Sequence, residues 1–167
     1  MARQGARWDR RPDRDGTDHG GEGVSHSDSD KADRLAKVEL FRLFDRRHLE
    51  ELARITEETS VEKGAVLCEQ GRVATECWIV VEGEAEVELG DGKLVGVIGP
   101  GEAIGEMGLL DHLPRSATVR ARTPMSVYRI DGRRFDELLG PSPLARTLLE
   151  LLSRRIRNLE HGRQFVS

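Results

Sequence analysis

Short segments with a hydrophobic period of two fill residues 59–130, and this pattern limits the possible folds more than any other feature of the chain. Residues 77–83 are an almost continuous apolar run, typical of a well-buried strand, and residues 84–89 alternate strictly between apolar and acidic side chains. The apolar side chains of the alternating segment, predicted to face inward, are Ala85, Val87 and Leu89. Residues 90–92, Gly-Asp-Gly, are a hairpin signal. Many short strands with Gly turns at close intervals favour an antiparallel β-barrel or jelly roll.

Helical periodicity flanks this region on both sides. Residues 35–44 and 46–55 predict two short helices, the second capped by Asp45, and Asp131 is the predicted N-cap of a helix that Gly140 ends. We therefore predict an α+β fold with flanking N-terminal and C-terminal helices. The expected organisation is a disordered tail (1–33), helices (34–58), the barrel (59–130), C-terminal helices (131–160) and a short tail (161–167), with 34–160 forming one domain.

Composition excludes several classes of protein. Residues 1–33 are rich in Arg, Asp, Gly and Ser, with acids interrupting the arginines, which predicts a solvated tail rather than a nucleic-acid arm. The formal net charge of -4 argues against general nucleic-acid binding. No segment approaches the ~20 apolar residues of a membrane span, and the N-terminus has no apolar core of a secretory signal.

Cysteine and histidine usage predicts a cytoplasmic protein without an active site. Cys68 and Cys77 lie in apolar runs and form no CxxC motif, so buried reduced thiols are expected; a disulfide between neighbouring strands is the alternative. His48, His112 and His161 lack the spacing of a metal site. No nucleophile and base are paired by any motif, so neither an enzyme nor a resident cofactor is expected.

The residues that carry chemistry lie between positions 99 and 119. Gly105 and Gly108 have no Cβ and allow a ligand to approach the backbone, where the first N–H groups of a helix favour an anion. Arg115 offers a planar fork of donors to two phosphate oxygens. Glu106 is an acceptor that suits a ligand hydroxyl such as a ribose 2′-OH. Together they predict a site for a sugar phosphate with one compact negative charge.

This stretch closely resembles the phosphate-binding cassette of the cyclic nucleotide-binding domain family. Ile-Gly-Glu-Met-Gly-Leu-Leu at 104–110 and Pro-Arg-Ser-Ala-Thr-Val at 114–119 carry the resemblance, which extends over about 35–159. It implies that Arg115 pairs with the phosphate oxygens and that Glu106 accepts a hydrogen bond from the ribose. The ligand-binding residues it implies are Val95, Ile98, Gly105, Glu106, Met107, Gly108, Arg115 and Ser116.

The same resemblance bears on the choice between cAMP and cGMP and on the residues that would cover the base. Ser116 occupies a position where family members that prefer cGMP often have Thr, while the bacterial activator has Ser; the bacterial resemblance favours cAMP over cGMP. The family's last helix serves as a lid over the base. The nearest lid candidates here are Ile156, Leu159 and Phe165.

Three functions stay open at this point. The leading one is a ligand-responsive regulatory module that signals to a protein partner. The second is an interaction module that has lost nucleotide binding and docks a partner or dimerises through the C-terminal helix, with Leu148, Leu152 and Ile156. The third is a transcription factor, but no helix-turn-helix follows that helix, so direct DNA binding is not expected, nor is membrane binding. The alternative interpretation of Arg115 is a surface ion pair with Glu106 or Asp111.

Overall fold

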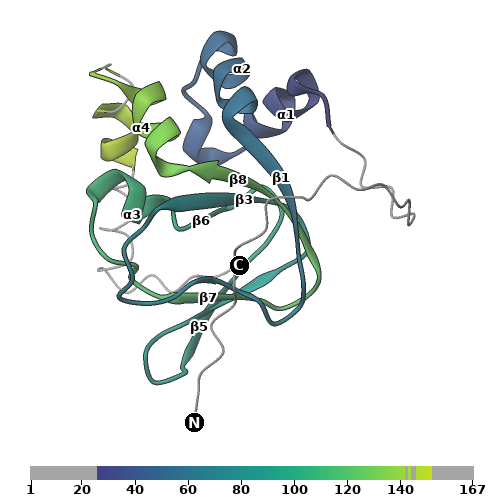
Figure 1. Ribbon diagram of the computed structural model, residues 1–167, viewed down its shortest axis with the longest axis vertical. Coiled ribbons are helices and arrows are strands. Elements are labelled where there is room, and N and C mark those ends of the chain that lie inside the picture. The colour runs from purple at the N-terminus through teal and green to yellow at the C-terminus, as the bar shows by residue number, and fades with distance from the viewer. Residues whose placement is uncertain (1–25, 142, 144–145, 152–167) are drawn as a thin grey trace, which may run out of the picture.

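Two four-stranded antiparallel sheets pack face to face in the computed structural model, which describes residues 26–141, 143 and 146–151 (Figure 1). The first sheet has the order β1 (Thr56–Val61), β8 (Met125–Asp131), β3 (Glu76–Glu82), β6 (Ala103–Ile104). The second sheet has the order β2 (Val66–Cys68), β7 (Thr118–Ala121), β4 (Ala85–Glu88), β5 (Leu94–Ile98). This arrangement confirms the predicted jelly-roll-like α+β fold.

Helices cover the face of the first sheet that is turned away from the second (Figure 1). They are α1 (Asp28–Leu35), a 3-10 turn η1 (Glu39–Phe41), α2 (Arg46–Ile55) and α4 (Gly132–Leu139); residues 146–151 are also helical. A further short helix, α3 (Glu106–Asp111), lies at the edge of this sheet directly after β6.

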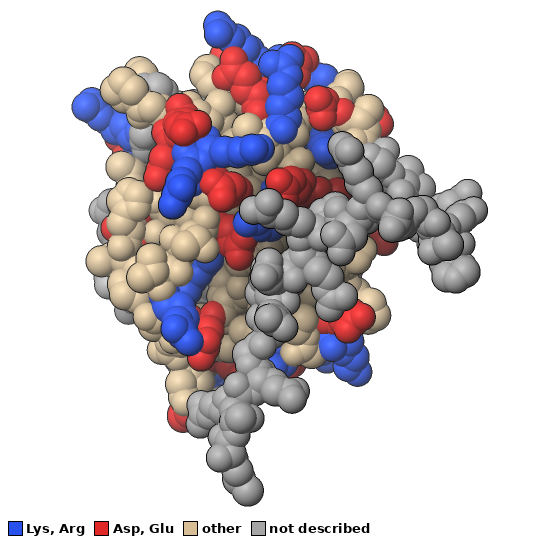
Figure 2. Space-filling view, viewed as in Figure 1, with Lys and Arg blue, Asp and Glu red and all other residues tan. Residues whose placement is uncertain are grey.

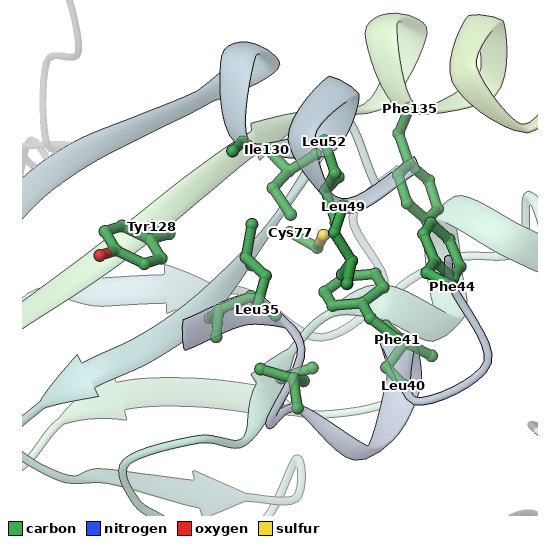
Figure 3. Close-up of a cluster of buried hydrophobic side chains, with 14 of the residues drawn as sticks. Leu35, Leu40, Phe41, Phe44, Leu49, Leu52, Cys77, Tyr128, Ile130 and Phe135 are labelled. Carbon is green, nitrogen blue, oxygen red and sulfur yellow. The ribbon is translucent and has the colours of Figure 1, made fainter. Parts of the chain in front are cut away.

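The first sheet separates two hydrophobic cores because side chains of a strand alternate between its faces. On β3, Cys77 and Ile79 belong to the core under the helices, whereas Trp78 and Val80 belong to the core between the sheets. Figure 3 shows the first core, where aromatic and leucine side chains of the helices converge on the sheet. Its labelled members are Leu35, Leu40, Phe41, Phe44, Leu49, Leu52, Cys77, Tyr128, Ile130 and Phe135.

Local capping signals fix the helix ends as predicted. The Asp45 side chain accepts a hydrogen bond from the backbone N–H of His48 at the start of α2. Asp131 accepts from the N–H groups of Arg133 and Arg134 at the start of α4, and Gly140 ends that helix. These carboxylates satisfy N–H groups that have no partner within the helix.

The N-terminal prediction differs from the structure in two places. Helix α1 already begins at Asp28, because Ser27 caps it and Ala32 and Leu35 are buried in the helix-side core. The boundary predicted at residue 58 between the helical region and the barrel lies earlier: α2 ends at Ile55, and Thr56 opens β1, pairing with Ile130 of β8. Pairing with a distant strand overrides the helical tendency of the glutamates in β1.

Two other predictions concern the hairpin between β4 and β5 and the chain ends. The hairpin is confirmed, since the N–H of Leu89 donates to the carbonyl of Lys93 at 3.0 Å. The prediction that Leu89 faces inward is wrong. This residue is 40% exposed, because β4 ends at Glu88 and Leu89 opens the turn. Residues 1–25 and 152–167, with the predicted lid residues and Leu152, lie outside the described residues.

Charges of both signs are interspersed on the face drawn in Figure 2. Ion pairs form along α2 from Arg46 to Glu50 and from Arg47 to Glu51. Within the described part of the chain, no helix has the length and apolar character that crossing a membrane requires.

Candidate functional site

The site is built where β6 passes into α3. Gly105, the N-cap of α3, has a left-handed backbone with φ of 77°, and Glu106, the first helical residue, is only 4% exposed. A Cβ at Gly105 would overlap the Arg115 guanidinium and stand 2.9 Å from the Cys68 sulfur. Glycine is therefore required here both by the backbone conformation and by the arginine that packs against it.

Arg115 is a buried residue, only 8% exposed, and not the surface residue of the alternative interpretation. Its Nη1 donates to the carbonyl of Gly105 and its Nη2 to the carbonyl of Glu76, each at 2.6 Å. Its guanidinium carbon lies 5.5 Å from the centre of the Trp78 ring, within the range of a cation–π contact. The fork is thus oriented before any ligand arrives.

The backbone of Arg115 is fixed as firmly as its side chain. Its N–H donates to the carbonyl of Arg72 at 2.8 Å, and its own carbonyl accepts from the N–H of Gly71 at 2.8 Å. These bonds tie the segment after α3 to the loop between β2 and β3. Because this loop leads directly into Glu76 and Trp78, the partners of the guanidinium are held by the same connection.

Two cassette residues, Gly108 and Met107, pack against the interior of the protein. A Cβ at Gly108 would stand 2.5 Å from the Cβ of Ala74 and 3.2 Å from the carbonyl of Leu113, so tight packing already accounts for this glycine. Met107 packs its partly buried side chain against the helix-side core. The space that the sequence assigned to a ligand at Gly108 is therefore occupied by Ala74.

The remaining predicted residues lie on β5 and after Arg115. Ile98 pairs with Ala85 and packs against the core that contains Trp78. Val95 is half-buried at a register shift in the β4–β5 pairing. Ser116 is exposed. The structure thus brings Gly105, Glu106 and Arg115 together.

Sequence reasoning missed four residues around this centre: Cys68, Glu76, Trp78 and Arg129. The Glu76 carboxylate forms an ion pair with Arg129, whose Nη1 also binds Glu57 at 3.1 Å. Alternation along β3 could have placed Glu76 and Trp78 on one face, but their contact with Arg115 depends on the fold. Among the described residues, no cluster of His, Cys, Asp or Glu could hold a metal ion.

Both cysteines are free and buried, as predicted. Burial raises the pKa of the Cys68 thiol to about 11, and the nearby Arg115 charge only partly opposes this. Burial also raises the pKa of Cys77. Each thiol borders the site as a neutral, unreactive group.

Stability should consequently fall in alkaline solution. A thiol whose pKa is raised by folding binds its proton more tightly in the native state, so its contribution is complete below the unfolded pKa of about 8.5 and is lost as pH rises toward 11. For Cys68 the loss amounts to about 3 kcal/mol. Urea unfolding at several pH values should show a steeper decline for the wild type than for Cys68→Ala. Equal declines would contradict this account.

Comparison with known proteins now identifies the family. The sequence model of the cyclic nucleotide-binding domain matches residues 58–141, and the chain belongs to that family. The match begins inside β1 and ends just after α4, so it includes both sheets and the whole cassette.

One relative and two solved structures show how far this similarity reaches. An uncharacterized ABC transporter ATP-binding protein of Mycobacterium tuberculosis is 44% identical over 104 residues, which cover 60% of this chain and 31% of the relative. A cAMP-bound PfPKA-R structure has 25% identity and a TM-score of 0.69, covering 80% of this chain and 45% of that chain. The regulatory subunit of a cAMP-independent protein kinase A from Trypanosoma brucei has 23% identity and a TM-score of 0.69, covering 81% and 47%.

These similarities differ in which properties they allow us to transfer to this chain. The chain spans about a third of the length of the curated relative, so the transporter function of that relative is not transferred. The Trypanosoma brucei protein shares the fold alone, and it belongs to a protein kinase A that is independent of cAMP. The fold therefore does not decide between a nucleotide sensor and a module without a ligand, and the decision rests on the site.

Proposed function

We propose that this chain binds a cyclic nucleotide, cAMP in preference to cGMP, and acts as a ligand-responsive regulatory module. The observation that carries the proposal is the buried Arg115 guanidinium, held at 2.6 Å by the carbonyl of Gly105 at the start of α3. A sugar phosphate beside it would place its anion against a cation at the start of α3, and its hydroxyl could donate to the buried Glu106.

The bonds of Arg115 explain how a ligand would be sensed. Both hydrogen-bond acceptors of the guanidinium are neutral carbonyl oxygens, whereas a phosphate oxygen carries a negative charge and adds ion–ion attraction and bidentate geometry to the hydrogen bond. A cyclic phosphate would therefore compete with the carbonyl of Gly105 for Nη1. Because Gly105 is the N-cap of α3, this exchange would reposition the start of the helix. Binding then has different contacts in two states, which any ligand response requires.

The remaining roles follow the resemblance. Glu106 would accept a hydrogen bond from the ribose 2′-OH, Ile98 would support the sugar and base, and Ser116 would lie beside the phosphate. The cAMP-bound structure with 25% identity supports cAMP as the first ligand to test. In the mycobacterial relative the matching segment is part of a larger transporter ATPase, so we propose that the output here is control of a protein partner, not a reaction.

Calorimetric titration tests this function directly. The full chain should bind cAMP with micromolar or tighter affinity and bind cGMP more weakly. Linear 5′-AMP is the matched control, because it keeps base and ribose but carries an open phosphate of higher charge; it should bind far more weakly than cAMP. Absence of heat with both cyclic nucleotides would favour the interaction module instead.

A further inference from the structure

A charged group of three residues lies across the first sheet beside the candidate site. Arg129 on β8 is directly opposite Glu57 on β1 and directly opposite Trp78 on β3. It forms ion pairs with the carboxylates of Glu57 and Glu76. Trp78 packs in the core between the sheets, so these charges lie on the face of the sheet that is turned toward the second sheet.

Glu76 connects this group to Arg115 through two different atoms. Its backbone carbonyl accepts the hydrogen bond from Arg115 Nη2 at 2.6 Å, while its carboxylate is bound by Arg129 Nε. The Cys68 thiol lies within electrostatic reach of both the Arg115 guanidinium and the Glu76 carboxylate. The carboxylate thus belongs to a residue whose backbone is bonded to the cation that the proposed ligand needs, and only 27% of the Glu76 side chain is exposed.

We propose that Arg129 is a positioning residue that keeps the Glu76 carboxylate away from Arg115. A carboxylate is acceptor-only and pairs readily with both oxygens on a guanidinium fork, as a phosphate does. Without Arg129, Glu76 becomes an internal competitor for the same donors. With Arg129 in place, Arg115 meets the neutral carbonyl of Glu76 and stays available to an anion. This inference rests on the proposed function, because it assigns regulation to the same site.

The test measures cAMP affinity of the full chain by calorimetry. Arg129→Gln should weaken binding about tenfold, the effect of one partly buried competing ion pair. Glu76→Gln alone should leave affinity unchanged or slightly tighter, because it removes the competitor and keeps the backbone carbonyl. The double variant Arg129→Gln/Glu76→Gln should regain wild-type affinity. The deficit of Arg129→Gln should also shrink at high salt, which screens the competing pair.

Glu57→Gln is the matched control, because it removes the other carboxylate that pairs with Arg129. The Glu57 side chain is 61% exposed, and the variant should bind cAMP with wild-type affinity. If the double variant bound cAMP as weakly as Arg129→Gln does, the role of Arg129 would be merely structural, which would overturn the inference. So would a large loss in Glu76→Gln, a result that stands even where Arg129→Gln folds poorly. A wild type that binds neither cAMP nor cGMP overturns the proposed function and this inference together, whereas equal affinities of wild type and Arg129→Gln overturn this inference alone.

Discussion

Replacing Arg115 with Gln is expected to abolish cAMP binding, at a cost of about 3–5 kcal/mol in binding free energy. The guanidinium is buried and its fork already points at the start of α3, so its removal leaves the phosphate without the positive charge placed there. Gln keeps a hydrogen-bond donor on a shorter side chain and loses the charge. Calorimetry of the variant against cAMP checks the expectation.

Two controls separate the role in binding from a role in folding. Arg120→Gln removes another arginine that donates to a glycine carbonyl, that of Gly64 at 3.0 Å, and should leave affinity unchanged. Arg115→Lys keeps the charge without the planar fork and should bind with intermediate affinity. Thermal unfolding should show that each variant is folded at the temperature of the titration. Binding by Arg115→Gln within a few-fold of wild type would reject the site described here.

The sequence predicted those parts of the structure whose cause is local. The caps at Asp45 and Asp131 depend on N–H groups two or three residues away, and the hairpin after β4 depends on a Gly-Asp-Gly turn. The cassette could be recognised because its residues are close together in the chain. Residues 104–119 therefore disclosed both a family and a candidate site.

Features that depend on distant pairing were not predictable in this way. Strand β1 contains adjacent glutamates that look helical, and it becomes a strand because β8 provides its hydrogen-bonding partners. Two partners of Arg115, the carbonyl of Glu76 and the ring of Trp78, come from strand β3, which the fold brings to it. The role of Arg129 follows only from its register opposite Trp78.

The glycines of the cassette were predicted correctly as positions of close approach, but the approaching group was not. The sequence indicated that Gly105 and Gly108 leave space, and space is indeed what both positions require. In the structure, however, Arg115 and Cys68 occupy the space at Gly105, and Ala74 occupies that at Gly108. A glycine pattern thus predicts a close approach without identifying the group that approaches.

Gly105→Ala should combine a loss of stability with a loss of binding. The left-handed backbone at φ of 77° disfavours any L side chain by roughly 1–2 kcal/mol, and the new Cβ would in addition displace the Arg115 guanidinium. We expect a total destabilisation of roughly 3 kcal/mol in urea unfolding, together with strongly weakened cAMP binding.

Gly64→Ala separates the two causes, because Gly64 has a similar φ of 87° but nothing within 4 Å of an added Cβ. It should lose only the backbone contribution and bind cAMP normally. The difference between the two variants then measures how rigidly Gly105, Arg115 and Cys68 are packed together. If Gly105→Ala were no less stable than Gly64→Ala and bound cAMP equally well, the guanidinium would move aside at no cost. The carbonyl of Gly105 would then not be the contact that sets Arg115 for its ligand, and the proposed coupling between phosphate binding and the start of α3 would be lost with it.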